Sequence, residues 1–423
     1  MTAALLGPLR GRGFRLLFWA RAASFVAYGI LGVAVSLQVY GLTRDSLHVA
    51  LVSAAVAVPM AVALILGGGL ADRRDRRAIM VWSRTAHLAT LAILIANAAL
   101  PEPLLWPIYA AAIVGGATFG IGMPALMAAT PALVPRAELA AAAALTAAVA
   151  QAGAVAGPFL AGALTARFGL VACYAAVAAL SGLTPLLLAR LPALPPQAPA
   201  GAPGARGAAA ATGAAAATGA AGTLRYLART PLIAGLLVAD LAAMILALPY
   251  ALLPEFGTRD LHGDTATVGL LYAAPSVGAL AVALGASAAG ASPRAGRYLV
   301  GSVAVWGVAV MGLGAASGLW SALLCLAAIG GAGVFAEILR AALIQSHTPD
   351  ALLGRVSSLW VLQATVGPAL GGLQAGLLAH LTSPRTAMLA GGAACLVATA
   401  CIALSVPALV RASLAGTRGA ADA

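Results

Sequence analysis

The chain has 423 residues, of which 62% are hydrophobic and only 9% are charged. A soluble domain carries about 25% charged residues to keep its surface hydrated, so this composition excludes a soluble globular protein. The net charge of +12 suits nucleic-acid binding, but the arginines are scattered between apolar runs and gather on no single face, which favours a membrane protein instead.

The apolar residues come in twelve successive runs, each near or above the length of about 20 residues that crosses a bilayer. The first run follows three arginines, but it is too long for a cleavable signal peptide, and we interpret it as a spanning helix. Because lipid offers the backbone no hydrogen-bond partners, the expected fold class is an all-α membrane protein with twelve transmembrane helices. The predicted spans are 16–40, 48–71, 78–99, 104–127, 139–163, 169–189, 231–254, 267–289, 298–317, 319–343, 356–380 and 386–409.

A segment of mostly Ala, Gly, Pro and Thr separates the sixth span from the seventh. Its side chains are too small to pack a core, so we interpret it as a flexible tether. The prediction is a six-helix bundle at 1–190, a flexible cytoplasmic linker at 191–229 and a second six-helix bundle at 230–423. Thr-Pro pairs close both the fourth and the tenth span, at 130 and 348, which favours two repeated halves.

The distribution of arginine predicts the orientation of the chain. With both termini in the cytoplasm, seventeen arginines lie on the cytoplasmic side and four on the other. The positive-inside rule favours this arrangement. We therefore predict a multi-pass protein of the cytoplasmic membrane with both termini in the cytoplasm.

The link after the second span reads GGLADRRDRR. It is similar to a loop signature of the major facilitator superfamily, although Asp75 stands where that signature usually has Gly. We predict a cytoplasmic gating loop in which the acid faces a helix N-terminus and the arginines pair with acids or lipid headgroups. A simple topology anchor is the alternative. The loop residues are Gly68, Asp72, Arg73, Arg76 and Arg77.

The fifth span contains GAVAGPFLAG, which resembles an exporter-associated signature of the same superfamily. Small residues let helices approach closely, and a proline inside a helix kinks it and frees a carbonyl. Ordinary small-residue packing is the alternative interpretation. The matching residues are Gly153, Gly157, Pro158 and Gly162.

Charged residues inside the predicted spans are candidates for function, because a buried charge in a bilayer needs a partner or a cavity. Asp240 lies near the middle of the seventh span, and Glu337 and Arg340 lie three residues apart on the tenth, where they are placed to pair. Arg21 shares a face of the first span with Phe25 and Tyr28.

Snorkelling toward the membrane surface is the alternative reading for two of these arginines, Arg21 and Arg340. For Arg84 on the third span, snorkelling is the favoured reading.

Several stretches in order along the chain resemble the bacterial enterobactin exporters of the major facilitator superfamily. The resemblance implies two six-helix bundles, with the first, fourth, seventh and tenth spans lining a central cavity. It also implies export of a siderophore driven by the proton motive force. The similar stretches include LGVAVSLQ (31–38), LADRRDRR (70–77), LMAATPALV (126–134), GLLYAAPSVGA (269–279), TPDALLGR (348–355) and SLWVLQ (358–363).

The predicted function is proton-coupled secondary export of a siderophore or a similar, anionic metabolite. Arg21 and Arg340 are expected to offer positive charge to the substrate, while Asp240 or Glu337 exchanges protons. The residues predicted to line the substrate and proton cavity are Arg21, Phe25, Tyr28, Asp240, Glu337, Arg340, Trp360 and Gln363.

A broad multidrug or macrolide efflux antiporter is the alternative function. A membrane sensor or enzyme has less support, because the sequence contains no catalytic cluster. We expect a monomer in the lipid bilayer that binds a small molecule and protons and uses no cofactor, metal or nucleic acid.

Overall fold

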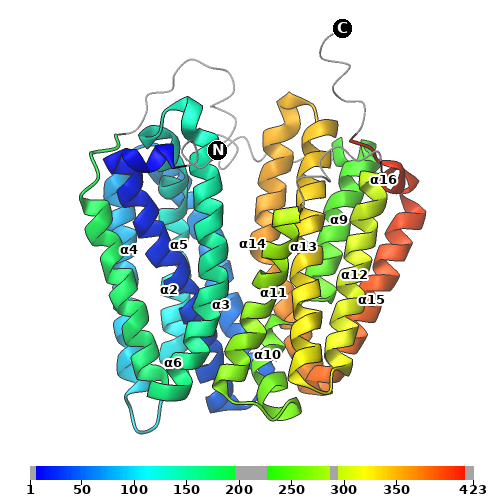
Figure 1. The fold of residues 1–423 in the computed structure, drawn as a ribbon, viewed down its shortest axis with the longest axis horizontal. Helices are drawn as coiled ribbons and strands as arrows, with labels where there is room; N and C mark the ends of the chain where they lie inside the picture. The colour runs from blue at the N-terminus through cyan, green and yellow to red at the C-terminus, as the bar shows by residue number, and fades with distance from the viewer. Residues whose placement is uncertain (1–5, 196–225, 286–293, 415–423) are drawn as a thin grey trace. The chain divides into compact units, whose positions relative to one another are not determined.

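The computed structural model describes residues 6–195, 226–285 and 294–414, with the side chains of 350 and 351 excepted. Every regular element in these ranges is a helix (Figure 1). Eleven helical segments of the described residues are long and apolar enough to cross a membrane. Exposed apolar side chains such as Trp320 (83%) and Leu404 (81%) suit a surface that faces lipid. The chain is therefore a multi-pass, all-α membrane protein, as predicted.

The elements before the predicted linker follow the predicted spans closely. Each of the first four predicted spans matches one helix, and the fifth and sixth lie together in a single long helix. The elements are η1 (Gly7–Arg10), α2 (Arg12–Thr43), α3 (Ser46–Ala71), α4 (Arg76–Ala98), α5 (Trp106–Leu133), η2 (Arg136–Glu138) and α6 (Leu139–Ala189).

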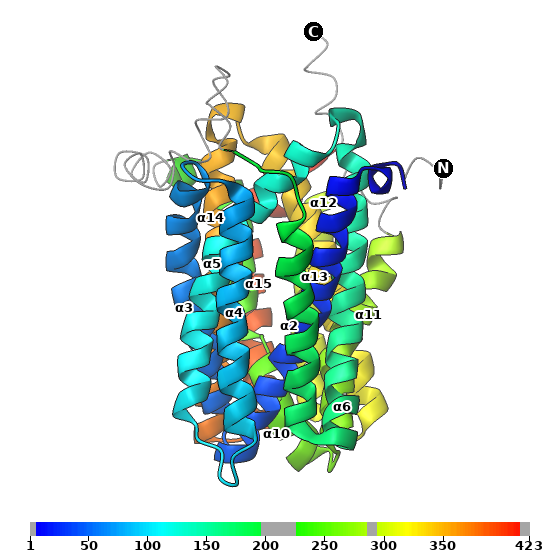
Figure 2. The ribbon, with the colours of Figure 1, turned by 90° about the vertical axis from the view of Figure 1, so that its left-hand side faces the viewer.

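The helix α6 reverses direction at Gly169. Straight, its 51 residues would measure about 77 Å, more than twice the thickness of a bilayer core. Gly169 has φ 78° and ψ 178°, a conformation that glycine adopts without steric cost. Beyond this turn the Sγ of Cys173 lies 4.0 Å from the carbonyl oxygen of Ala161, although a straight helix would separate these residues by about 18 Å. The helix is thus two antiparallel spans (Figure 2), which brings the number of spans to twelve.

The elements after the predicted linker depart from prediction in the seventh span. The sequence predicts one helix over 231–254, whereas α9 ends at Leu246 and three short helical segments follow. These elements are α9 (Pro231–Leu246), η3 (Tyr250–Leu252), α10 (Leu253–Glu255), η4 (Phe256–Asp260), α11 (Thr265–Gly285), α12 (Ala295–Ala315), α13 (Leu319–His347), α14 (Asp350–Leu381), α15 (Pro384–Ser405) and α16 (Pro407–Arg411).

The end of α9 has a local cause. Ala247 leaves helical geometry with φ −131° and ψ 41°, and Pro249 follows two residues later. The carbonyl oxygen of Ala247, freed from the helix, accepts a hydrogen bond of 2.8 Å from the indole nitrogen of Trp306. Non-helical backbone is tolerated at membrane depth where protein buries it, and Ala247 and Leu248 are both buried.

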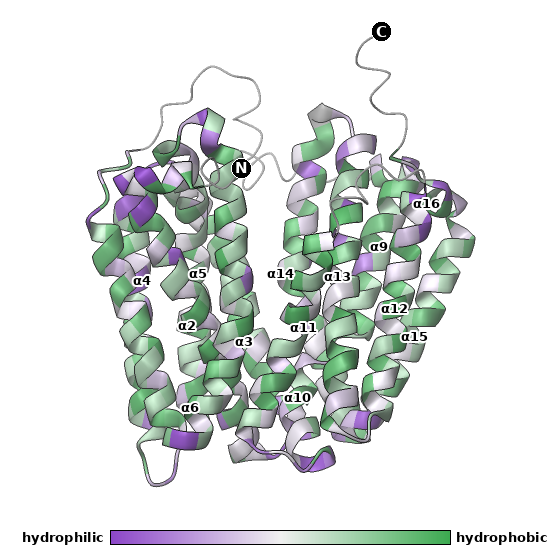
Figure 3. Cartoon of the chain, viewed as in Figure 1, coloured by the Kyte–Doolittle hydropathy of each residue, from purple (hydrophilic) through white to green (hydrophobic). Residues whose placement is uncertain are grey.

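The chain divides into two compact units. The first unit comprises Met1–Arg44, Leu51–Thr212 and Gly263–Ala273, and the second comprises Asp45–Ala50, Gly213–His262 and Ala274–Ala423. In each unit, hydrophilic residues gather toward helix ends and apolar residues cover the lengths between them (Figure 3). Most of the predicted linker, 191–229, lies outside the described residues, and the predicted bundle boundaries remain a prediction.

Candidate functional site

The predicted site residues fall into two groups, one in each unit. In the second unit, α9 and α13 bring Asp240 and Arg340 together, with 2.7 Å between Arg340 Nη2 and Asp240 Oδ1. Both residues are only 4% exposed, and each charge compensates the other where water is excluded. The predicted pairing of Arg340 with Glu337 is wrong, because the guanidinium reaches across to α9 instead. Snorkelling of Arg340 is excluded for the same reason.

Gln363 on α14 completes the bonding of the Asp240 carboxylate. Its Nε2 donates to Asp240 Oδ2 at 2.9 Å and to the carbonyl oxygen of Leu237 at 3.0 Å. One turn further along α14, Gly367 packs closely on α9, since a methyl group on this glycine would lie only 2.9 Å from the sulfur of Met244. Both carboxylate oxygens of Asp240 are therefore occupied by partners from other helices.

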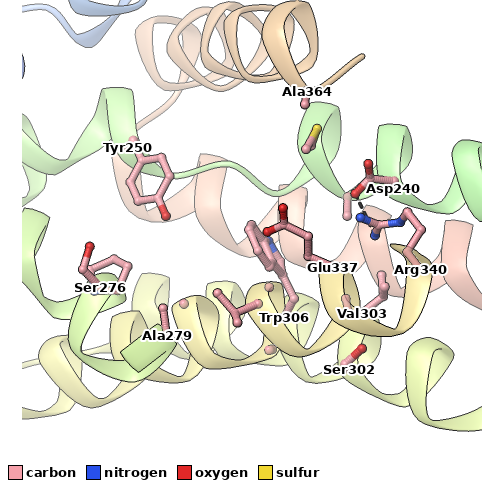
Figure 4. A pocket seen from close by; sticks show the side chains of 18 of the residues that line it. Asp240, Tyr250, Ser276, Ala279, Ser302, Val303, Trp306, Glu337, Arg340 and Ala364 are labelled. Atoms are coloured by element: carbon pink, nitrogen blue, oxygen red, sulfur yellow. Dashed lines mark ion pairs between the residues drawn. The ribbon is translucent and has the colours of Figure 1, made fainter. Parts of the chain in front are cut away.

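A cavity of about 320 Å³ adjoins this ion pair inside the second unit (Figure 4). Its charged lining consists of Asp240, Glu337 and Arg340, and its aromatic lining includes Tyr250, Trp306 and Trp360. The structure thus gathers around one cavity four of the residues predicted from sequence, three charged and one aromatic. Trp360 also packs against the apolar core of the unit, so it serves both the cavity wall and the core.

Trp306 is a cavity residue that the sequence analysis did not identify. Its indole is fixed by the bond to Ala247 at the end of α9, and its ring lies against Gly333, where a methyl group would come within 2.5 Å. Neither contact leaves a trace in a hydropathy pattern, because both depend on which helices become neighbours.

In the first unit, Arg21 is buried and bonded to neutral groups. It is 9% exposed, and it donates to the carbonyl oxygen of Leu126 at 2.7 Å and to the hydroxyl of Thr146 at 3.2 Å. The side chain therefore does not snorkel. Phe25, one turn further on, packs beside Gly153, where a methyl group would lie 2.7 Å from Phe25 Cβ.

Tyr28 belongs to a cluster of one buried cation and two partly buried aromatic rings, with Arg84 and Phe119. Arg84 donates a hydrogen bond to the Tyr28 hydroxyl and lies 5.4 Å from the centroids of both rings. At 8% exposure, Arg84 is no snorkelling anchor, and that interpretation is wrong. The sequence contained an indication of this burial. Arg84 lies eight residues beyond Arg76, which corresponds to about 12 Å along the helix and so places it well inside the span.

The predicted gating loop joins α3 to α4. Asp72 and Arg73 are exposed, while Arg76 and Arg77 are partly buried. A side chain at Gly68 would meet nothing within 4 Å, so helix packing does not require glycine at this position. A gating role of the loop remains a prediction.

Asp75, which departs from the loop signature, has a structural role. It caps α4 by accepting a hydrogen bond of 2.8 Å from the backbone nitrogen of Arg77. The same oxygen accepts a bond of 3.0 Å from the nitrogen of Leu194, and the carbonyl of Leu194 accepts from the nitrogen of Arg76 at 3.0 Å. The acid therefore fastens the chain beyond α6 to the start of α4.

The small-residue segment of the fifth span makes two close helix contacts within the first unit. A methyl group on Gly157 would lie 2.6 Å from the Cα of Gly29 on α2, and Pro158 lies beside the same glycine. A methyl group on Gly162 would lie 2.9 Å from the Cα of Gly269 on α11. Glycine is thus needed at both positions for backbone approach.

Twelve helical spans among the described residues, with a cavity inside one unit that charged and aromatic side chains line, are typical of membrane transporters of the major facilitator type. The chain belongs to the transmembrane secretion effector family, whose model matches residues 3–416. It is 34% identical over 382 residues to the enterobactin exporter EntS of Citrobacter koseri, and the match covers 89% of this chain and 88% of that protein. The enterobactin exporter EntS of Salmonella typhi is 35% identical over the same length and coverage. The predicted resemblance is confirmed.

The solved structures agree on the fold. A POT family transporter in complex with 5-aminolevulinic acid has a TM-score of 0.72 with 13% identity, covering 94% of this chain and 97% of that chain. A mutant of the nucleoside transporter NupG has a TM-score of 0.71 with 12% identity, covering 92% of this chain and 99% of that chain. At this identity the likeness concerns the fold alone. The family indicates a transporter and not an enzyme.

Proposed function

We propose that this protein is a proton-coupled exporter that expels a siderophore, or a similar metabolite, across the bacterial cytoplasmic membrane. The direction of transport and the substrate class are supported by the likeness to enterobactin exporters along most of the chain. The coupling is supported by one observation, the buried ion pair of Asp240 and Arg340 beside the cavity.

The geometry of the ion pair suggests how a proton could be exchanged for the substrate. While Asp240 is ionised, it holds Arg340 at 2.7 Å and neutralises it. Protonation of Asp240 removes the negative partner, so Arg340 becomes a free cation next to the cavity and attracts an anionic group of the substrate. Loss of the proton restores the ion pair and expels that group. Proton binding and substrate binding at this carboxylate thereby become linked.

The same proposal places both termini in the cytoplasm and the protein in the membrane as a monomer. The arginine distribution supports this orientation, with four arginines on the external side, namely Arg44, Arg167, Arg259 and Arg385. The loop of Gly68, Asp72, Arg73, Arg76 and Arg77 is then cytoplasmic, and we assign it the gating role.

Transport in proteoliposomes tests the coupling. Wild-type protein is expected to drive enterobactin efflux with an imposed pH gradient, and Asp240→Asn is expected to abolish the gradient-driven component. Glu102→Gln, which removes an exposed carboxylate outside the spans, is the matched control and is expected to behave like wild type. Unchanged gradient-driven efflux by Asp240→Asn would remove this residue from the coupling scheme.

A multidrug or macrolide efflux antiporter is the second candidate function. One observation favours it, namely that Glu337 lines the aromatic cavity and is exposed, which suits a cationic drug better than an anionic siderophore. Deletion of the gene separates the two functions. A siderophore exporter predicts lower siderophore secretion, whereas a drug antiporter predicts greater drug sensitivity with unchanged secretion.

A further inference from the structure

Glu337 differs from the other second-unit acids whose side chains the structure describes in having no bonded partner. The ion pairs of the described residues involve the carboxylates of Asp45, Asp240, Glu255 and Asp260. Glu337 makes no hydrogen bond or ion pair with any part of the chain that the structure describes, and its side chain is exposed in the cavity (Figure 4).

While Asp240 is ionised, the charges around the cavity leave a net negative site. Arg340 lies one helical turn from Glu337, but its guanidinium binds Asp240, and Gln363 occupies the second oxygen of that carboxylate. The pair of Asp240 and Arg340 is neutral as a whole, so Glu337 contributes the uncompensated charge. A carboxylate within a membrane span is costly unless a cation or water meets it.

The walls of the cavity suit a cation as well. Trp306, Trp360 and Tyr250 line the same space, and the electron-rich faces of such rings attract cations within about 6 Å. Trp306 is held in place by its bond to Ala247, so its ring is preorganised. Glu337 and Trp306 line the same cavity (Figure 4), so both kinds of attraction act on its occupant.

The size of the cavity limits the occupant. Its volume of about 320 Å³ lies at the lower end of the range of small-molecule pockets, about 300 to 1,000 Å³. The space therefore suits a single ring with an amine substituent, or the corresponding part of a larger molecule.

We propose that this cavity binds a protonated amine or a quaternary ammonium group, with Glu337 as the counter-ion and Trp306 and Trp360 as the aromatic walls. This inference rests on the proposed export function, but not on a siderophore being the substrate. It assigns to the transporter a substrate, or a substrate part, that carries a positive charge.

Calorimetric titration of the purified full-length protein in lipid nanodiscs tests the site. Benzyltrimethylammonium is the cationic probe, and phenylacetate is an anionic probe of similar size. Wild-type protein is expected to bind the cation at least about tenfold more tightly than the anion. Equal or tighter binding of the anion would overturn the inference.

Two variants of Glu337 distinguish the effect of its negative charge from the effect of its side-chain shape. Glu337→Gln is expected to weaken cation binding at least about tenfold, and Glu337→Asp is expected to stay within about threefold of wild type. Glu102→Gln removes an exposed carboxylate far along the chain and is expected to bind normally. Wild-type affinity in Glu337→Gln would refute the assignment, as would a loss in Glu337→Asp equal to that in Glu337→Gln.

Enterobactin efflux from proteoliposomes, measured on the same preparations, keeps the two proposals apart. If wild-type protein exports enterobactin but does not bind the cation, the amine site alone is wrong. If it binds the cation through Glu337 but exports no enterobactin, the siderophore proposal is wrong and the amine site stands.

Discussion

Buried arginines have different kinds of bonding partner in the two units. In the first unit, Arg21 and Arg84 are bonded to a backbone carbonyl and to hydroxyl groups, all of which are neutral. In the second unit, Arg340 is bonded to the carboxylate of Asp240. The first unit thus holds fixed positive charge stabilised by dipoles and rings, whereas the second holds a pair whose acid can gain or lose a proton. The proton exchange that we propose is accordingly assigned to the second unit.

Removal of one member of the ion pair should have the largest effect on stability. Arg340→Met leaves Asp240 buried without its cation, and we expect a loss of about 3–5 kcal/mol in the free energy of unfolding. Unfolding in mixed detergent micelles measures it. The double variant Asp240→Leu/Arg340→Met should return close to wild type, because an apolar replacement of a whole buried pair is often neutral. A double variant as unstable as the single one would contradict the ion-pair account.

Removal of a first-unit arginine should cost less. Arg84→Met leaves only the neutral Tyr28 hydroxyl unsatisfied and removes two ring contacts, so we expect a loss of about 2 kcal/mol. The same unfolding measurement checks it, with Tyr28→Phe/Arg84→Met as the companion that removes the orphaned hydroxyl. A loss of unfolding free energy equal to that of Arg340→Met would contradict the difference between the units. It would indicate a counter-charge near Arg84.

The smallest effect on stability is expected at Glu337. Because this carboxylate has no bonded partner among the described residues, Glu337→Gln should change the free energy of unfolding by no more than about 0.5 kcal/mol. Thermal unfolding of the two proteins in parallel is sufficient. A loss above about 1 kcal/mol would mean that Glu337 supports the fold, which would weaken its assignment to ligand binding.

The fold was predictable from sequence because lipid permits few solutions. Apolar runs located all twelve spans, including the pair that meets at Gly169, since each crossing must be helical. The end of the helix at Ala247 was not predictable. Hydropathy contains no information on backbone angles or on the hydrogen bond from Trp306, 59 residues away.

The charged residues of the candidate site were predictable from sequence, but their pairing and the aromatic wall formed by Trp306 were not. Asp240, Glu337 and Arg340 were identified as intramembrane charges, and the structure places all three at one cavity. Helical spacing suggested that Arg340 pairs with Glu337, yet packing of α13 beside α9 supplies a nearer acid. The transport role of these residues, and of the first-unit group, remains a prediction until the variants are measured.

The bond between Trp306 and Ala247 joins the wall of the cavity to the end of α9. A ligand that packs against this indole in its present position therefore also supports the irregular stretch of backbone that ends α9. Replacing Trp306 would in turn remove two things at once, a wall of the cavity and the donor to Ala247.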